Sequence, residues 1–167
     1  MKKHLKSIIA VAIVLCFAVL AIASGNKDND KKNNGGAKLS FGSTFEFDDL
    51  EITIGNADDI GWDEVNNSYN DHYGEDVVRL PVTITNKKDE THGLNFLYVD
   101  VYGPDGNKLD SVGSSTYDND YTDSWQMRPG ATKETNMHFL YNGDGEYVIE
   151  FDPIFGTKIE VYLSIAK

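Results

Sequence analysis

Three aspartates in one short polar stretch are the residues of this sequence best suited to bind a cation. Asp118, Asp120 and Asp123 lie close together in the chain, and carboxylate oxygens are ligands that Ca²⁺ prefers. The stretch lacks the central glycine and the terminal glutamate of the EF-hand loop. Apart from calcium, with these three aspartates as its candidate ligands, we expect no cofactor. The alternative is a solvated acidic loop.

Aromatic side chains occur in the same polar stretch and in an earlier one. Tyrosine and tryptophan provide a large contact area at a low entropic cost, so on loops they are candidates for contacting a protein or glycan partner. Burial against the core is the alternative, and it is our expectation for the two tryptophans. The candidate contact residues are Tyr69, Tyr73, Tyr117 and Tyr121, and the two tryptophans are Trp62 and Trp125.

No arrangement of residues in the sequence predicts a catalytic site. His72, His92 and His138 have no metal-ligand spacing between them. We expect structural or solvated roles for them, with His138 on the solvent-facing side of a strand. The 113–115 stretch lacks the strand-to-helix turn that holds a hydrolase nucleophile. We therefore expect that the protein is not an enzyme; a deep cleft with convergent acids and histidines would favour the enzyme alternative.

The composition indicates one acidic, folded domain. The chain has 167 residues, of which 40% are hydrophobic and 11% aromatic, enough for a packed core. Its 27 acidic and 15 basic residues give a formal net charge of −12, which repels nucleic acids and anionic lipids. We therefore expect no nucleic-acid partner. The only cysteine is Cys16, in the N-terminal apolar segment, so no disulfide is expected in the domain.

The N-terminal residues have the pattern of an export signal. Lysines precede an apolar segment over 8–23, and Ala21 and Ala23 occupy the positions expected before a cleavage site. As a helix this segment would span about 24 Å, less than the roughly 30 Å hydrocarbon core, so a short membrane anchor is the less favoured alternative. We expect a signal peptide over 1–23 and a flexible polar linker over 24–38. The protein would then lie outside the cytoplasm, secreted or at the cell surface, with membrane contact only through an uncleaved N-terminal segment.

Hydrophobic residues alternate with polar ones through most of residues 39–167, which is typical of antiparallel strands with one buried face. Pro81 interrupts one such run. Because proline cannot donate a ladder hydrogen bond, we expect its strand to be an edge strand or to carry a bulge there. The 94–102 run is apolar on both sides, and we expect a strand with Leu97, Val99 and Val101 facing the core. The predicted runs cover 44–47, 50–54, 78–85, 94–102, 135–141, 147–151 and 159–165.

Turn residues separate these runs, and no segment after residue 38 has a helical hydrophobic stripe. The pattern predicts an all-β, antiparallel β-sandwich of immunoglobulin-like architecture, with seven or eight strands, over residues 39–167. Two long acidic connections, 56–76 and 103–123, interrupt the strands. Long loops on a rigid scaffold commonly carry binding sites.

Four stretches of the chain resemble a known family: FGSTFEFDDLEITIG, VVRLPVTITNKKDE, YGPDGNKL and WQMRPGATKETNMHFLY. They are similar to exported immunoglobulin-like domains of unknown function from low-GC Gram-positive bacteria, which are usually lipoproteins. The resemblance covers about 39–167 and implies export and a β-sandwich, with no catalytic residue to transfer. This chain departs from the family pattern because Ser24 stands where a lipoprotein has its lipid-bearing cysteine.

These observations favour an exported binding module. We expect a non-catalytic domain whose two long connections contact an extracellular protein, a glycan or a cationic partner at the cell envelope. The alternative is an inhibitor or immunity-type protein that presents its acidic loops to the basic cleft of a secreted enzyme. A co-purifying basic hydrolase would distinguish this alternative from the first function.

Overall fold

The computed structural model describes residues 38–113, 117–124 and 126–167. The predicted signal peptide and all but the last residue of the predicted linker lie outside the described residues. Within the described part of the chain, no helix is long and apolar enough to cross a membrane.

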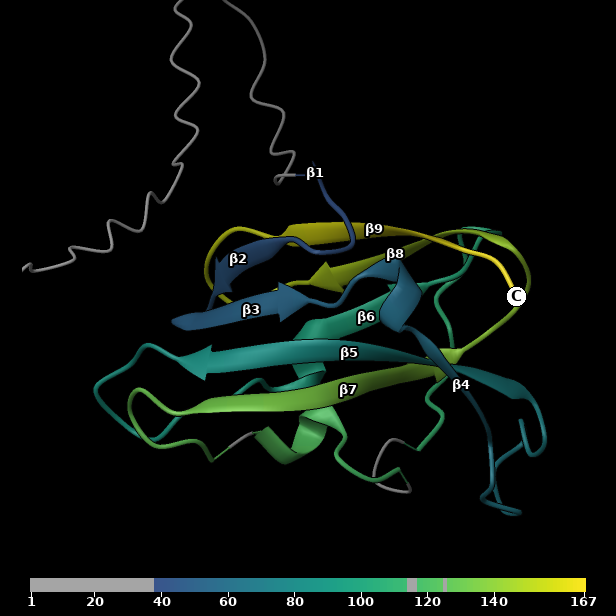
Figure 1. Ribbon diagram of the computed structural model, residues 1–167, viewed down its shortest axis with the longest axis horizontal. Coiled ribbons are helices and arrows are strands. Elements are labelled where there is room, and N and C mark those ends of the chain that lie inside the picture. Colours follow the sequence, from purple (N-terminus) through teal and green to yellow (C-terminus); the bar gives the residue numbers. More distant parts are fainter. Residues whose placement is uncertain (1–37, 114–116, 125) are drawn as a thin grey trace, which may run out of the picture. The chain divides into compact units, whose positions relative to one another are not determined.

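Two β-sheets form the domain (Figure 1). One sheet has the strand order β1-β9-β8-β6, and in the other β5 pairs with β3, β4 and β7, while β2 pairs with β3. All pairs are antiparallel except β1 with β9. The predicted all-β, antiparallel fold is confirmed. The strands are β1 (Lys38–Leu39), β2 (Thr44–Phe47), β3 (Leu50–Ile54), β4 (Gly61–Glu64), β5 (Asp76–Asn86), β6 (Val99–Tyr102), β7 (Thr132–Leu140), β8 (Gly145–Phe151) and β9 (Ile159–Ile165).

Alternating side chains fill the space between the two sheets. On β3, Leu50, Ile52 and Ile54 are buried while the residues between them are not. From the facing sheet, Phe151 packs against Phe45 and Phe47 of β2, with ring centroids 5.1 and 5.5 Å apart. These aromatic contacts join the two layers, since edge-on ring pairs add to the free energy gained by burial.

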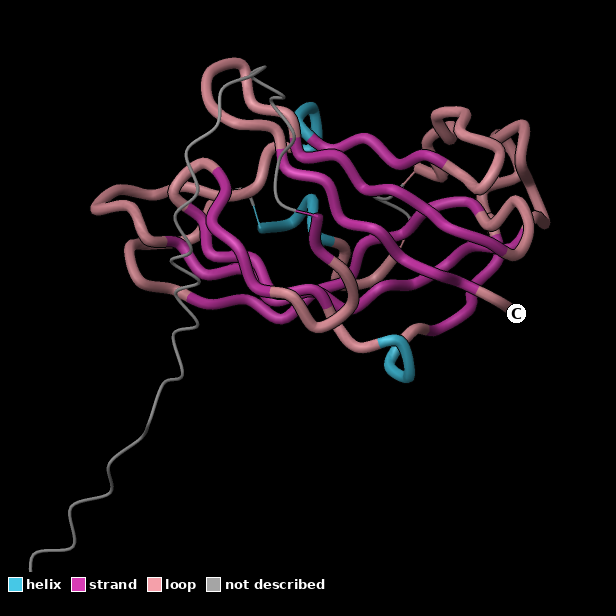
Figure 2. Tube along the Cα trace, turned by 90° about the horizontal axis from the view of Figure 1, so that it is seen from above, coloured by secondary structure: helices cyan, strands magenta, loops and turns pink. Residues whose placement is uncertain are grey.

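Two of the nine described strands were not expected from the sequence. β1 has only two residues, and β4 (GWDE) contains a single large apolar residue, so neither shows an alternating pattern. β4 lies inside the first predicted long connection and pairs with the first residues of β5. Most loops of the domain lie at the ends of the strands, as Figure 2 shows.

The prediction that Pro81 lies in an edge or bulged strand was wrong. β5 pairs on both sides, with β7 along one edge and with β3 and β4 along the other. The Gly55 N–H donates to the Pro81 carbonyl (2.8 Å), so the backbone groups of Pro81 face the interval between β3 and β4. The missing N–H therefore costs no ladder hydrogen bond. Gly55 is required for this approach, because a Cβ there would lie 2.8 Å from the Pro81 oxygen.

The predicted 94–102 strand is only half right. β6 contains its last four residues, and a single 3₁₀ turn, η2 (Phe96–Tyr98), precedes it. Asn95 caps this turn, because its side chain accepts a hydrogen bond from the Leu97 N–H (3.0 Å). The turn leaves Phe96 and Leu97 exposed, whereas Leu97 was expected in the core.

We predict that Phe151→Ala lowers the free energy of unfolding by about 3–5 kcal/mol, because it leaves a cavity where three aromatic rings meet. Urea denaturation of the purified chain measures this change. Phe155→Ala is the control: this ring is almost fully exposed, so its removal should change the unfolding free energy by no more than about 0.5 kcal/mol. Equal effects of the two substitutions would contradict the described core.

Candidate functional site

The two long connections meet at one end of the domain. We call residues 65–75 the first loop and residues 103–124 the second connection, of which 114–116 are not described. The Asn70 side-chain amide donates to the Ser111 carbonyl (3.3 Å). Behind this contact, Val65 of the first loop and Val112 of the second connection share a small buried cluster with Val77 and Leu140. The sequence could not establish this adjacency.

His72 provides the charged contact between the first loop and the second connection. Its Nδ1 lies 3.0 Å from a Glu75 carboxylate oxygen, and its Nε2 lies 3.3 Å from an Asp110 carboxylate oxygen. The hydrogen bond with Glu75, and to a smaller extent that with Asp110, raises the pKa of His72 above its ordinary value, although desolvation opposes the rise. The protonated ring can donate to both carboxylates at once.

The four candidate tyrosines divide into two pairs. Tyr69 and Tyr73, both on the first loop, are 96% and 61% exposed. Tyr117 is partly buried and stacks on His138 with ring centroids 4.4 Å apart, and Tyr121 belongs to the hydrophobic core. The first loop therefore carries the aromatic side chains that a partner could contact.

The tryptophans were expected to fold inward. Trp62 is half-buried and packs edge-on against Tyr141, with ring centroids 5.1 Å apart, while the Lys167 ammonium lies 5.2 Å from its ring. Trp125 lies outside the described residues.

The predicted calcium ligands do not share one environment. Asp118 is exposed, and Asp120 is buried. One Asp120 oxygen lies 2.6 Å from His138 Nδ1, and the other accepts hydrogen bonds from the N–H (3.0 Å) and the hydroxyl (2.8 Å) of Thr122. The Asp123 side chain lies outside the described part of the structure. Among described residues no three His, Cys, Asp or Glu side chains are placed to hold a metal ion, so calcium binding stays a prediction.

His138 was expected on a solvent-facing strand surface, and this was wrong. Its side chain is 1% exposed, because the second connection covers the outer side of β7. The Asn136 N–H donates to the Asn119 carbonyl (3.0 Å), and the Asn119 side-chain amide donates to the Glu134 carbonyl (3.1 Å). Strand alternation could not reveal this, since the covering segment comes from elsewhere in the chain.

The buried imidazole links three parts of the fold. Its Nδ1 contacts Asp120, at the start of the 3₁₀ turn η4 (Tyr121–Ser124), and its Nε2 lies 3.8 Å from an Asp63 carboxylate oxygen of β4. Tyr117 covers its face. A carboxylate oxygen thus lies opposite each ring nitrogen, and the ring connects β7 with β4 and with the second connection.

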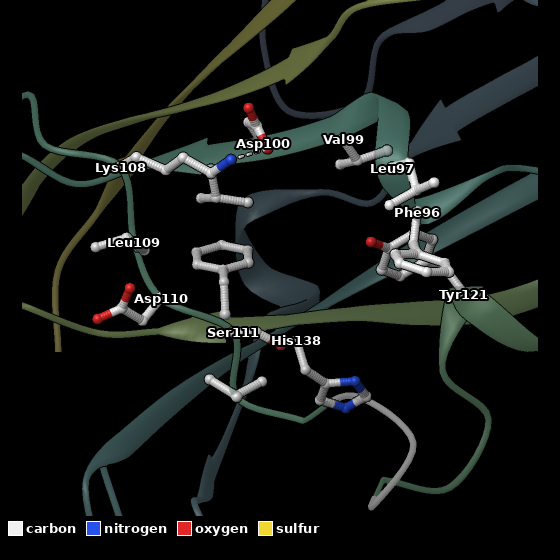
Figure 3. A pocket seen from close by; sticks show the side chains of 13 residues that line it. Phe96, Leu97, Val99, Asp100, Lys108, Leu109, Asp110, Ser111, Tyr121 and His138 are labelled. Carbon is white, nitrogen blue, oxygen red and sulfur yellow. Dashed lines mark ion pairs between the residues drawn. The ribbon is translucent and has the colours of Figure 1, made fainter. Parts of the chain in front are cut away.

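A cavity of about 310 Å³ lies where the edges of the two sheets separate. Figure 3 shows its side chains converging from β6, from η2 and from the second connection. The Lys108 ammonium lies 2.6 Å from an Asp100 carboxylate oxygen on its rim. A second cavity of about 500 Å³ adjoins the other side of Phe96. The sequence pattern did not indicate either cavity, because Phe96 and Leu97 fit a regular strand there. The apolar lining includes Phe96, Leu97, Val99, Val101, Tyr121 and Phe139.

We predict that Asp120→Ala lowers the free energy of unfolding by about 3 kcal/mol, because it removes one partner of a buried pair and leaves His138 without its 2.6 Å contact. Denaturation by urea measures this change. Asp118→Ala removes an exposed acid two residues away and should cost no more than about 0.5 kcal/mol. A cost for Asp120→Ala as small as that control would show that the pair does not hold the second connection.

We predict that the NMR titration of His72 gives a pKa above the ordinary value of 6.5. The stabilising contact is then complete below about pH 6.5 and is lost as the pH rises through the higher pKa of the folded state. Asp110→Asn should lower the pKa of His72 toward its ordinary value, whereas Asp118→Asn should leave it unchanged. An unchanged titration in Asp110→Asn would mean that His72 does not contact Asp110 in solution.

Solved structures of several bacterial proteins are similar to this chain. The yjhA protein of Bacillus subtilis aligns with a TM-score of 0.55 and 12% identity over 75% of this chain and 99% of its own. A candidate lipoprotein of the same species, ycdA, aligns with a TM-score of 0.50 and 14% identity over 72% of this chain and 38% of its own. An uncharacterised β-sandwich protein of Clostridium difficile has a TM-score of 0.46 and 17% identity over 82% of this chain and all of its own. At these identities the likeness shows the fold alone.

The sequence also matches a family model. No curated protein matches the chain, but a model described as a domain of unknown function, DUF4352, matches residues 39–161. The expected resemblance to a bacterial domain of unknown function is thereby confirmed, while export stays a prediction. Because the matched residues make up well over half of the chain, the protein belongs to the DUF4352 family.

Proposed function

We propose that this protein is a non-catalytic binding module that acts outside the cytoplasm, secreted or attached to the cell surface. The export-type N-terminal sequence and the polar linker support this location. The name of the structural neighbour ycdA, a candidate lipoprotein, is consistent with it. In this proposal the partner is an extracellular protein or glycan.

The observation that carries the proposal is the exposed aromatic pair on a supported loop. Tyr69 and Tyr73 stand out from the first loop, and the contacts to Ser111 and Asp110 hold that loop against the second connection. Aromatic residues that are exposed on a held loop bind with little loss of conformational entropy.

The charge of this surface favours a basic partner. Glu75 and Asp110 are exposed on either side of His72, and the whole chain has a formal net charge of −12. Complementary charge speeds association and disfavours wrong partners. The same surface supports the second candidate function, an inhibitor or immunity-type protein that covers the basic cleft of a secreted enzyme.

We expect the double substitution Tyr69→Ala, Tyr73→Ala to abolish partner capture without changing stability, because both rings are exposed. The measurement is proximity labelling in the producing bacterium, together with co-sedimentation of the purified chain with isolated cell walls. Phe155→Ala, which removes a highly exposed ring from another loop, is the control and should behave as the unsubstituted protein.

Unchanged labelling and co-sedimentation in the tyrosine variant would contradict the proposed surface. A labelled secreted hydrolase whose activity falls on addition of this protein would select the inhibitor function. Co-sedimentation with cell walls that needs the tyrosines would select the glycan partner.

A further inference from the structure

β6 is the last strand of its sheet, and its outer edge, which Lys108 bridges at Tyr102, adjoins the 310 Å³ cavity. The lining of this cavity includes neither Tyr69 nor Tyr73. We propose that this edge binds an extended peptide segment of a partner protein, which adds to the sheet as a short strand and inserts an apolar side chain into the cavity. This site shares Asp110 with the surface assigned to the first loop, but Tyr69 and Tyr73 are not part of it.

Hydrogen bonding along β6 identifies the backbone groups that face outward. The Tyr98 carbonyl accepts a hydrogen bond from the Asp152 N–H (2.8 Å) on the β8 side. Because the direction alternates along an antiparallel strand, the backbone groups of Val99 and Val101 point away from β8, toward the cavity that both residues line.

Two of these outward groups already have partners. The Val99 N–H donates to the Phe96 carbonyl, and the Val101 carbonyl accepts from the Leu109 N–H (2.8 Å). Within the described residues, the Val99 carbonyl and the Val101 N–H are left without a backbone partner. An acceptor and a donor spaced in this way match an extended chain, which offers an N–H and a C=O along one edge.

The cavity beside this edge suits a side chain of the added segment. Alternate residues of a strand point to opposite faces, so one side chain would project between the two sheets, among Val99, Tyr121 and Phe139. The volume of about 310 Å³ lies at the lower end of the range of ligand pockets. Leu97, exposed at the rim, provides apolar surface beside the entrance.

The rim indicates the charge of the segment. Asp100 and Asp110 carry negative charge there, and Lys108 pairs with Asp100 (2.6 Å). The acids outnumber the base, and the chain as a whole is acidic, so a basic residue next to the inserted apolar one is favoured. Only a few residues can pair, because the Gly103 N–H donates to the Asn107 carbonyl and closes the edge beyond Val101.

The test selects phage-displayed random peptides on the purified chain and compares their binding to variants. Val101→Pro removes the outward N–H without removing a bond to β8. Leu97→Ser replaces an apolar side chain at the cavity rim with a polar one. Ile154→Ser is the matched control, because Leu97 and Ile154 are 71% and 72% exposed but Ile154 lines neither cavity. We expect the selected peptides to contain an apolar residue beside a basic one. Val101→Pro and Leu97→Ser should each raise the dissociation constant of these peptides about tenfold, and Ile154→Ser should not.

A chemical change to the peptide tests strand addition even if Val101→Pro does not fold. N-methylation of the peptide amide that faces the Val99 carbonyl should also weaken binding about tenfold, and the unmodified peptide should shift the NMR signal of the Val101 amide. The proposal is overturned if no peptide is enriched, if the N-methylated peptide binds equally well, or if the Val101 amide signal does not move.

Discussion

The buried pair of Asp120 and His138 fixes the path of the second connection across the open side of the sandwich. This connection runs from β6 in one sheet to β7 in the other, and at 2.6 Å the pair holds it on the outer side of β7. A buried charge is costly unless it is paired, so the contact favours one position of the segment. The hydrogen bond between Asn136 and Asn119 follows from that position.

Two surfaces depend on the position of this segment. On one side, Asp110 and Ser111 reach the first loop and support the tyrosines that it exposes. On the other side, the Leu109 N–H donates to the Val101 carbonyl, while the Val99 carbonyl and the Val101 N–H stay without a described backbone partner beside the cavity. The β-sandwich supplies the rigid frame, but the crossing segment decides which loop is held and which strand edge stays available.

The parts of the fold that the sequence predicts well are those with one buried face. β3, β8 and β9 alternate buried and more exposed residues along their length, and their extents agree with the predicted runs. Prediction failed where segments from elsewhere in the chain set the environment of a residue. His138 is buried by a distant segment, and the central position of β5 despite Pro81 depends on the interval between two partner strands. Neither cause is local in the sequence.

In the candidate site, too, the sequence predicted the features that are local and missed those that depend on distant contacts. Composition was enough to place exposed tyrosines on a long acidic loop, as Tyr69 and Tyr73 show. It could not predict that Tyr121 joins the core, that His72 contacts Asp110, or that η2 interrupts an apolar run to open a cavity beside Phe96. Each of these depends on a contact between residues far apart in the chain.

Amide hydrogen exchange of the free protein tests the central claim most directly. If the second connection lies on β7 as described, the Asn136 N–H, which donates to Asn119, exchanges slowly. If the edge of β6 is open, the Val101 N–H exchanges much faster than the paired amides of the same strand. A fast Asn136 amide, or a Val101 amide as protected as its neighbours Asp100 and Tyr102, would contradict the account.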